Sequence, residues 1–189
     1  MDSILWDEFR YLSTSNDPIV KIHPRIIVGA GNQLTLENIR DYDIHYVVNC
    51  AFDEFSPSWF RNLYPYNYAC VEAYDDDDSN ITDWYKLFES FMNRFMKEDD
   101  GTIFVHCHLG INRSAFLALL YVCLKFDYDM KSTIKVMLIT RPCVFMNKEY
   151  RKQVVEFCEQ DKVFKKNFFT INAKFKCIME WLFNQYQFK

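Results

Sequence analysis

Val105-His-Cys-His-Leu-Gly-Ile-Asn-Arg-Ser114 is the stretch that decides the fold of this chain. It places Cys107 and Arg113 at the two ends of a short segment with Gly110 midway between them. An apolar run of strand length precedes the segment, and an apolar run with helical periodicity follows it. This order of strand, loop and helix is typical of an anion-binding loop, in which backbone N–H groups and the positive end of a helix face one ligand.

The residue types of this loop indicate nucleophilic chemistry on a phosphate ester. A helix N-terminus favours the thiolate form of a cysteine, so Cys107 is the candidate nucleophile. Arg113 offers a planar fork that can hold two phosphate oxygens at once. The loop itself has no acid in position to protonate a leaving group. The run Asp75-Asp-Asp-Asp78 is the candidate donor, and a solvated turn with N-capping aspartates is the alternative interpretation of that run.

The rest of the chain alternates between two kinds of pattern. Apolar runs of strand length, bounded by Gly, Pro, Asp or Asn, lie at residues 25–29, 45–50, 68–71 and 102–106. Helical patterns lie at residues 35–42, 83–96, 114–126, 130–139 and 147–160. The alternation predicts an α/β fold of a single domain, with a central, mostly parallel sheet flanked by helices.

Two terminal segments lie outside this alternation. Residues 1–20 carry apolar positions at helical spacing and predict an N-terminal helical extension, whereas residues 161–189 are rich in aromatic side chains and predict a C-terminal helical extension. Residues 21–160 then form the domain that carries the loop. A helix packed on the core is the favoured interpretation of the C-terminal segment, and a homodimer through the terminal helices is the alternative.

Composition limits the compartment and the partners. A chain of 189 residues with 50% hydrophobic content can bury one sizeable core. Since no apolar stretch is long enough to cross a bilayer and the start lacks a signal peptide, we expect an intracellular, cytoplasmic protein without a membrane partner, with the nucleus as an alternative. Seven cysteines without close paired spacings fit a reducing compartment, and a net charge of -4 argues against broad nucleic-acid binding.

Several segments together resemble the dual-specificity phosphatases of the cysteine-based protein tyrosine phosphatase superfamily. His106-Cys-x-x-Gly-x-x-Arg-Ser114 looks like the family signature, and residues 24–29 and 44–50 are similar to its first two strands. Arg141-Pro142, followed by Asn147, is similar to its closing segment. The resemblance implies a protein tyrosine phosphatase-like fold of the dual-specificity type.

The same resemblance implies a role for each residue of the site. Cys107 would form a phosphocysteine, with Asp75 as general acid and then general base. Arg113 would bind the phosphate, Ser114 would help the thiolate leave, and His106 would tune the cysteine. The other residues expected to bind the substrate phosphate are His108, Leu109, Gly110, Ile111 and Asn112.

The activity implied is hydrolysis of phosphotyrosine and phosphoserine or phosphothreonine in phosphorylated proteins, without a cofactor or a metal. Asp76 is the second choice for the acid, because Asp75 has the family's spacing to Ile81. An RNA 5'-phosphatase of the same superfamily is an alternative, since Gly110-Ile-Asn-Arg113 is similar to the loop of such enzymes.

Three further readings of the loop are less favoured. A phosphoinositide substrate is disfavoured because the loop has no lysine to meet extra ring phosphates. A catalytically weak phosphate-binding module would normally have lost the cysteine, the arginine or the acid. Metal binding by His106, Cys107 and His108 is disfavoured because adjacent residues of a strand point to opposite faces.

Overall fold

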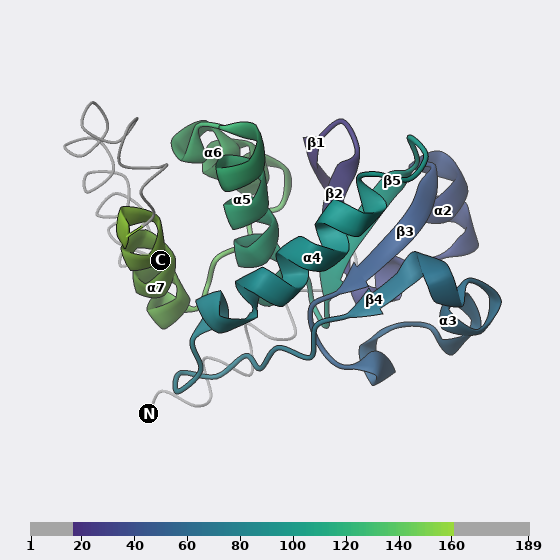
Figure 1. The fold of residues 1–189 in the computed structure, drawn as a ribbon, viewed down its shortest axis with the longest axis horizontal. Helices are drawn as coiled ribbons and strands as arrows, with labels where there is room; N and C mark the ends of the chain where they lie inside the picture. Colours follow the sequence, from purple (N-terminus) through teal and green to yellow (C-terminus); the bar gives the residue numbers. More distant parts are fainter. Residues whose placement is uncertain (1–16, 161–189) are drawn as a thin grey trace.

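A five-stranded sheet with helices on both faces makes up residues 17–160, the part of the chain that this computed structural model describes (Figure 1). The expected helices within residues 1–16 and 161–189 lie outside the described residues. The strands are β1 (Val20–His23), β2 (Ile26–Ala30), β3 (Ile44–Asn49), β4 (Tyr68–Cys70) and β5 (Thr102–Cys107). The helices are α2 (Leu36–Asp41), α3 (Ser58–Leu63), α4 (Tyr85–Phe95), α5 (Arg113–Phe126), α6 (Met130–Thr140) and α7 (Lys148–Gln160).

Four single turns of 3-10 helix join these elements: η1 (Gly31–Gln33), η2 (Asp53–Phe55), η3 (Pro65–Asn67) and η4 (Ile81–Trp84). The sequence predicted the four parallel strands and five of the helices, and it missed β1 and α3. Both missed elements are short: β1 has four residues and α3 has six, of which only Phe60 is buried. Such lengths offer too few apolar positions for a period to emerge.

The order of the strands is β1-β2-β5-β3-β4, so the last strand in the sequence lies in the middle of the sheet. β5 pairs in parallel with β2 on one side and with β3 on the other, and only β1 runs antiparallel. All six residues of β5 are buried, which explains why its sequence shows no alternation. The register places Cys107 opposite Ala30 and His106 opposite Asn49, at the carboxyl edge of the sheet.

The two faces of the sheet pack against different helices. One face, with Val28, Val48 and Val105, belongs to the larger core cluster together with residues of α4, α5, α6 and α7. The other face, with Val47 and Phe104, packs against the side of α2 and α3. Residues 113–123 of α5 are buried throughout, because this helix lies between the sheet and the other helices of its layer.

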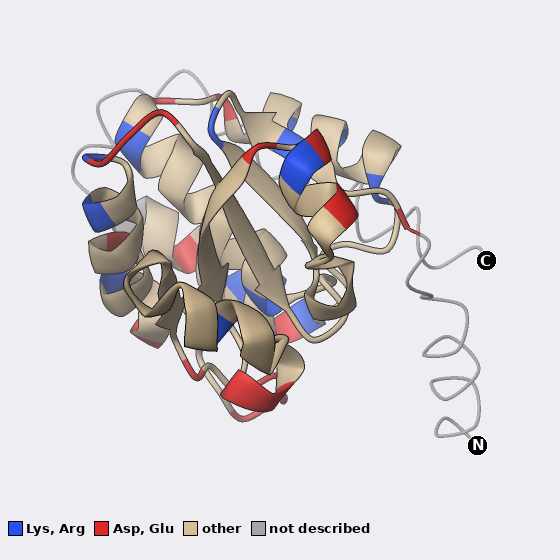
Figure 2. Ribbon diagram, turned by 90° about the vertical axis from the view of Figure 1, so that its right-hand side faces the viewer, with Lys and Arg blue, Asp and Glu red and all other residues tan. Residues whose placement is uncertain are grey.

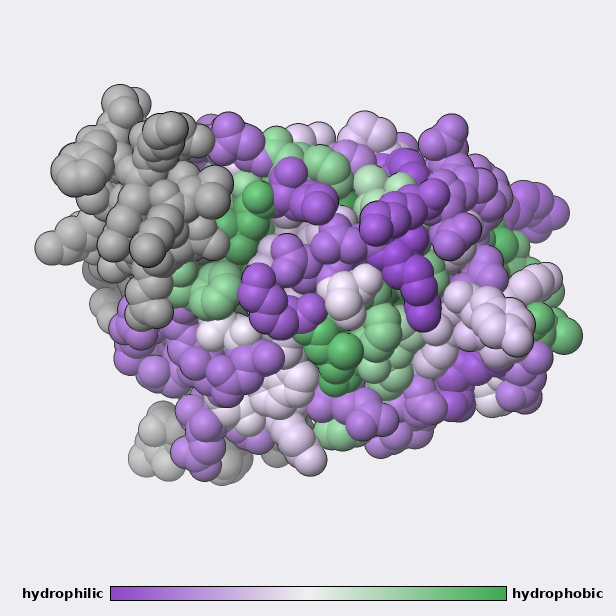
Figure 3. All heavy atoms as spheres, viewed as in Figure 1, coloured by the Kyte–Doolittle hydropathy of each residue, from purple (hydrophilic) through white to green (hydrophobic). Residues whose placement is uncertain are grey.

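Charged side chains lie mainly outside the sheet, and Lys21 of the edge strand β1 is the exception within it. Strands β2 to β5 contain no Lys, Arg, Asp or Glu, and Figure 2 shows these residues on the helices and loops. Seen from the side of α4, the outer surface is mainly hydrophilic with small, separate apolar patches (Figure 3). None of the helices that the structure describes combines the length and the apolar character needed to span a bilayer.

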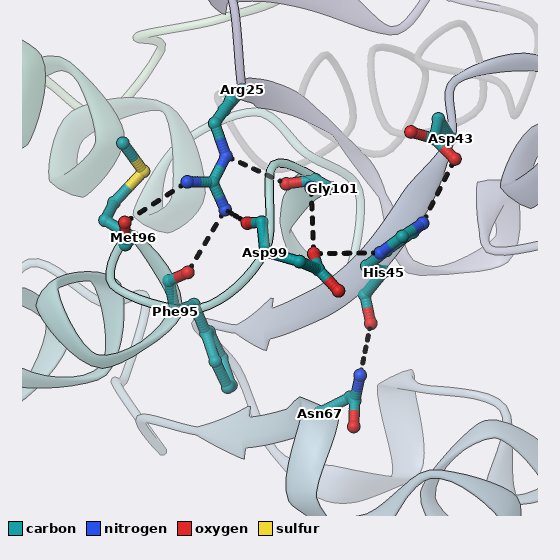
Figure 4. A network of polar contacts seen from close by, with 8 residues as sticks. All are labelled: Arg25, Asp43, His45, Asn67, Phe95, Met96, Asp99 and Gly101. Carbon is teal, nitrogen blue, oxygen red and sulfur yellow. Dashed lines mark hydrogen bonds and ion pairs between the residues drawn. The ribbon is translucent and has the colours of Figure 1, made fainter.

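A polar network closes the opposite, amino-terminal edge of the sheet (Figure 4). The guanidinium of Arg25 donates hydrogen bonds to the carbonyl oxygens of Phe95 (3.2 Å), Met96 (3.1 Å) and Gly101 (3.1 Å), and also to the carbonyl of Asp99. The Asp99 carboxylate in turn accepts the N–H of Gly101. Arg25 therefore caps the carboxyl end of α4 and fixes the turn that leads into β5.

Replacing Arg25 by lysine should destabilise the fold. A single ammonium group cannot serve all these carbonyl groups, so several acceptors at the end of α4 lose a charged donor, and we expect a loss of about 1.5–3 kcal/mol in the free energy of unfolding. Unfolding in denaturant measures this change in the free energy of unfolding. Arg40→Lys on α2 is the matched control and should change stability by less than about 0.5 kcal/mol. Equal stabilities for the two variants would contradict this account of Arg25.

Candidate active site

The loop of residues 107–113, here called the anion loop, joins the end of β5 to the start of α5. Each of its first six carbonyl groups accepts a hydrogen bond from a group outside the loop's centre. The donors, in order from Cys107 to Asn112, are His106 Nδ1 (3.0 Å), the N–H of Gly31 (3.1 Å), Arg141 Nη2 (2.7 Å), Arg141 Nε (2.8 Å), the N–H of Phe145 (2.8 Å) and the N–H of Phe116 (2.9 Å).

This orientation of the carbonyl groups fixes the direction of the amides. The described peptide bonds are all trans, and in a trans peptide the C=O of one residue and the N–H of the next point in opposite directions. The N–H groups of residues 108–113 therefore turn toward the centre of the loop. Asn112, the N-cap of α5, makes no side-chain cap, so the positive end of this 14-residue helix also faces that centre. The arrangement is a nest for an anion.

Gly110 is the residue that lets the loop turn so tightly. Its φ is +66°, in the region that favours glycine. A Cβ atom at this position would lie 2.3 Å from the carbonyl oxygen of Gly29 on β2. Both the backbone conformation and the close contact exclude a side chain, as expected for the single glycine of the loop.

Cys107 lies at the base of the nest, at the end of β5, with 1% of its surface exposed. The hydroxyl of Ser114, in the first turn of α5, donates to Cys107 Sγ at 3.4 Å. Burial raises the pKa of four other described thiols and so disfavours their thiolates: to about 11 for Cys70, to about 12 for Cys143, and well above the usual range for Cys50 and Cys123.

His106 is neutral and holds the backbone of Cys107 in place. Burial lowers the pKa of His106 to about 4. The carbonyl oxygen of Cys107 can only accept, so His106 Nδ1 carries the proton and Nε2 accepts the hydroxyl proton of Ser56 at 2.6 Å. Ser56, which follows η2, is a site residue that the sequence did not reveal, because it lies 50 residues before its partner.

Arg113 approaches the nest from the first turn of α5. Its side chain is mostly buried, and its Nη1 donates to the carbonyl of Ala73 at 3.1 Å. Its Nε is buried, lies 3.5 Å from the carboxylate of Asp75, and makes no hydrogen bond with any of residues 17–160. Leaving such a donor unsatisfied costs about 1–3 kcal/mol, and an oxygen of a bound oxyanion would remove that cost.

Asp75 lies on the loop of residues 74–80, here called the acid loop, and its carboxylate is 3.2 Å from Nδ2 of Asn112. Burial raises the pKa of Asp75, and Arg113 together with hydrogen bonds from Asn112 and Asn147 opposes that rise. The net rise favours a carboxyl group that can carry a proton. Asp76, the second choice, instead accepts the N–H groups of its own turn with Oδ1.

Helix α7 holds the acid loop through two side chains that the sequence did not single out. The hydroxyl of Tyr150 donates to the carbonyl of Tyr74 at 2.6 Å. The amide of Gln153 accepts the N–H of Ile81 and donates to the carbonyl of Ser79, both at 2.9 Å. These contacts fix both ends of the acid loop, and no local sequence pattern could have identified them.

Arg141 supports the anion loop from outside. It is 1% exposed, and besides the carbonyls of Leu109 and Gly110 it binds those of Asp17 (2.8 Å) and Pro18 (3.0 Å). The sequence marked Arg141 only through the family resemblance, with no role attached. Arg141 therefore links residues 17 and 18 to the anion loop.

The remaining residues expected at the site have distinct positions. The ring of His108 stacks on Phe55 with 4.3 Å between centroids, at the outer side of the loop. Leu109 and Ile111 contribute backbone groups, and the side chain of Asn112 faces Asp75. The structure thus brings every residue expected at the site from the sequence to one edge of the sheet: Asp75, His106, Cys107, His108, Leu109, Gly110, Ile111, Asn112, Arg113 and Ser114.

This geometry belongs to a known family. Residues 26–160 match the family described as "Dual specificity phosphatase, catalytic domain", so the chain is a member of that family. The resemblance stated from the sequence is confirmed.

The chain also matches curated proteins, each of which is longer than the matched segment. It is 25% identical over 149 residues to a probable dual specificity protein phosphatase of Dictyostelium discoideum, and this match covers 79% of this chain and 36% of that protein. It is 25% identical over 142 residues to dual specificity protein phosphatase 4 of Gallus gallus, with 75% and 36% covered. The match to the protein phosphatase Slingshot of Drosophila melanogaster, at 23% identity, covers 73% of this chain but 13% of Slingshot.

Solved structures confirm the predicted fold class. The human tyrosine phosphatase-like serine/threonine/tyrosine-interacting protein superposes with a TM-score of 0.63 at 19% identity, covering 75% of this chain and 96% of that one. Human DUSP28 gives a TM-score of 0.62 at 17% identity, with 74% and 92% covered. At these identities the likeness concerns the fold alone.

Replacing Arg141 by lysine should weaken anion binding. One ammonium group cannot hold the carbonyls of Leu109 and Gly110 together with those of residues 17 and 18, so the amides of the loop lose their fixed direction, and we expect tungstate to bind about tenfold more weakly. Calorimetric titration with tungstate measures this change. Arg94→Lys on α4 is the control and should bind as the unaltered protein does. Unchanged tungstate affinity in Arg141→Lys would show that the loop keeps its shape without Arg141.

Proposed function

We propose that the chain is a cysteine-dependent phosphatase that hydrolyses phosphotyrosine and phosphoserine or phosphothreonine in proteins. The observation that carries the proposal is the outward orientation of six successive carbonyl groups, which turns the amides of residues 108–113 toward the sulfur of Cys107. The Nε of Arg113, which makes no hydrogen bond within residues 17–160, and the carboxyl group of Asp75 border the same centre. A tetrahedral dianion satisfies all of these groups together.

The first step transfers the phosphoryl group to the enzyme. Cys107 Sγ attacks phosphorus, the bond from phosphorus to the ester oxygen breaks, and Asp75 donates its proton to the leaving oxygen. Arg113 and the loop amides stabilise the charge that moves onto the equatorial oxygens. The products of this step are a phosphocysteine and the free hydroxyl of the substrate residue.

The second step returns the cysteine. Water attacks phosphorus as Asp75 accepts a proton from it, and the bond from phosphorus to Cys107 Sγ breaks. The Ser114 hydroxyl, 3.4 Å from that sulfur, stabilises the departing thiolate by donating a hydrogen bond. Inorganic phosphate then leaves.

Charge near the site favours phosphoproteins over polyanionic substrates. The acid loop contains four consecutive aspartates beside the anion loop, and the anion loop has no lysine. An RNA 5' end or a phosphoinositide would bring several negative charges toward these carboxylates, whereas a single phosphorylated side chain brings only its own phosphate. A binding module without catalysis is the remaining alternative, and the presence of Cys107, Arg113 and Asp75 together argues against it.

Replacing Cys107 by serine should abolish release of inorganic phosphate, because a neutral hydroxyl cannot replace the thiolate as nucleophile. Release is measured in EDTA from a phosphotyrosine peptide, a phosphothreonine peptide and 5'-triphosphate RNA, with Cys143→Ser as the control that stays active. We expect release from both peptides by the unaltered protein and the control alone. Release from RNA only would overturn the substrate, and no release at all would favour the binding module.

Replacing Asp75 by asparagine should slow alkyl phosphates about 100-fold, because a poor leaving group depends on the proton that Asp75 supplies. Hydrolysis of p-nitrophenyl phosphate, which has a good leaving group, should slow much less.

The raised pKa of Asp75 keeps its carboxyl group protonated to higher pH, so the unaltered protein should lose kcat only above that pKa. The Asp75→Asn variant should lack this basic limb of the pH profile. Rates against pH measure both effects, and Asp76→Asn is the matched control. If Asp76→Asn loses the limb instead, Asp76 is the acid.

A further inference from the structure

The side chain of Asn112 joins three parts of the site. Its Nδ2 donates to Asp75 Oδ1 at 3.2 Å and lies 3.5 Å from Oδ2, and its Oδ1 accepts the backbone N–H of Asn147 at 2.9 Å. A backbone N–H can only donate, so the amide of Asn112 must present its oxygen to Asn147. Its NH2 group is thereby directed at the carboxylate of Asp75.

Asn147, whose backbone N–H donates to Asn112, is itself held in place. Asn147 Oδ1 accepts the N–H of Tyr150, at the start of α7, and the N–H of Phe145 binds the carbonyl of Ile111. The segment before α7 is thus anchored to the anion loop at two adjacent residues. Because Asn112 makes no cap of α5, its side chain is available for this bridge.

We propose that Asn112 is a positioning residue for the general acid, whose side-chain amide holds Asp75 over the anion loop before substrate binds. The proposal rests on the phosphatase function proposed above. The backbone N–H of Asn112 still belongs to the nest, and its side chain acts on Asp75 and not on the phosphate.

The two oxygens of Asp75 then have separate tasks. Oδ1 is held by Asn112, whereas Oδ2 lies 3.5 Å from Nε of Arg113. When a phosphate oxygen takes that Nε, Oδ2 loses its cationic neighbour while Oδ1 keeps its donor. Oδ2 is then the oxygen that carries the proton to the leaving group. Without Asn112, the carboxylate keeps Arg113 and the side chain of Asn147 as partners. The cation of Arg113 then draws it toward the phosphate site and away from the leaving oxygen.

The test uses the full chain with two variants and a control. Asn112→Ala removes the bridge. Asn112→Asp keeps the size and the acceptor for Asn147 but replaces the donor with a negative charge. Asn67→Ala is the control, since Asn67 donates its amide to the carbonyl of His45 at the opposite edge of the sheet (Figure 4). Tungstate binding reports whether the anion loop is intact in each protein.

Two measurements separate positioning from a structural role. In kinetics, Asn112→Ala should slow alkyl phosphates about tenfold and p-nitrophenyl phosphate less than about twofold, at unchanged tungstate affinity, because only proton donation is impaired. Asn112→Asp should also slow alkyl phosphates more than p-nitrophenyl phosphate, but it should bind tungstate more weakly because its carboxylate repels the anion. In NMR titration of the labelled Asp75 carboxyl carbon, its pKa should rise in Asn112→Ala and rise further in Asn112→Asp. The sign follows because the amide donor stabilises the carboxylate, and a second carboxylate destabilises it.

The outcomes distinguish this inference from the function on which it rests. If the unaltered protein releases no phosphate but the pKa of Asp75 rises in the order given, the phosphatase function fails and the tether of Asp75 by Asn112 stands. If the protein is active and both Asn112 variants behave as Asn67→Ala in kinetics and titration, the inference is wrong. Equal slowing of all phosphate esters with loss of tungstate affinity in Asn112→Ala would also overturn it, because Asn112 would then serve the anion loop itself.

Discussion

The contact between the Arg141 guanidinium and the carbonyls of Leu109 and Gly110 is the interaction on which the site depends. An anion nest is unfavourable when empty, because its N–H dipoles point at one another across a small volume. The loop keeps this orientation because its carbonyl groups have donors on the outside, and Arg141 supplies two of the six. Its guanidinium also donates to the carbonyls of Asp17 and Pro18, so the same buried charge holds the segment before β1 against the loop. The hydrogen bonds from Arg141 to these carbonyls lie outside the nest and do not contact a bound anion, yet they orient the amides that bind it.

A second layer of contacts prepares the acid. Asp75 has no regular secondary structure of its own, and its position depends on α7 through Tyr150 and Gln153 and on the anion loop through Asn112. Each of these partners is a neutral polar group, so these contacts hold the acid loop without adding a charge near Asp75. Burial can then raise the pKa of Asp75 while the geometry stays fixed.

Sequence patterns predicted the candidate site residues more easily than the residues that hold them in place. The sequence could place Cys107 and Arg113 together because strand, glycine-containing loop and helix are contiguous, and it could place Asp75 beside them because carboxyl ends of parallel strands share one edge. β1 and α3 were missed because four and six residues do not establish a period. Ser56, Arg141 and Gln153 were missed as supports for a different reason. Their partners are distant in the sequence, up to 124 residues for the bond from Arg141 to Asp17, and only the folded chain brings them together.

The central place of β5 has a consequence for synthesis of the chain. Because β5 lies between β2 and β3, the first four strands emerge from the ribosome before the strand that joins them into one sheet. Until residues 102–107 follow, β2 and β3 each present an apolar edge with unpaired backbone groups, which is the state in which chains associate wrongly. The nascent domain thus passes through an interval in which it needs protection from other chains, and that interval ends only when the strand that bears Cys107 is inserted.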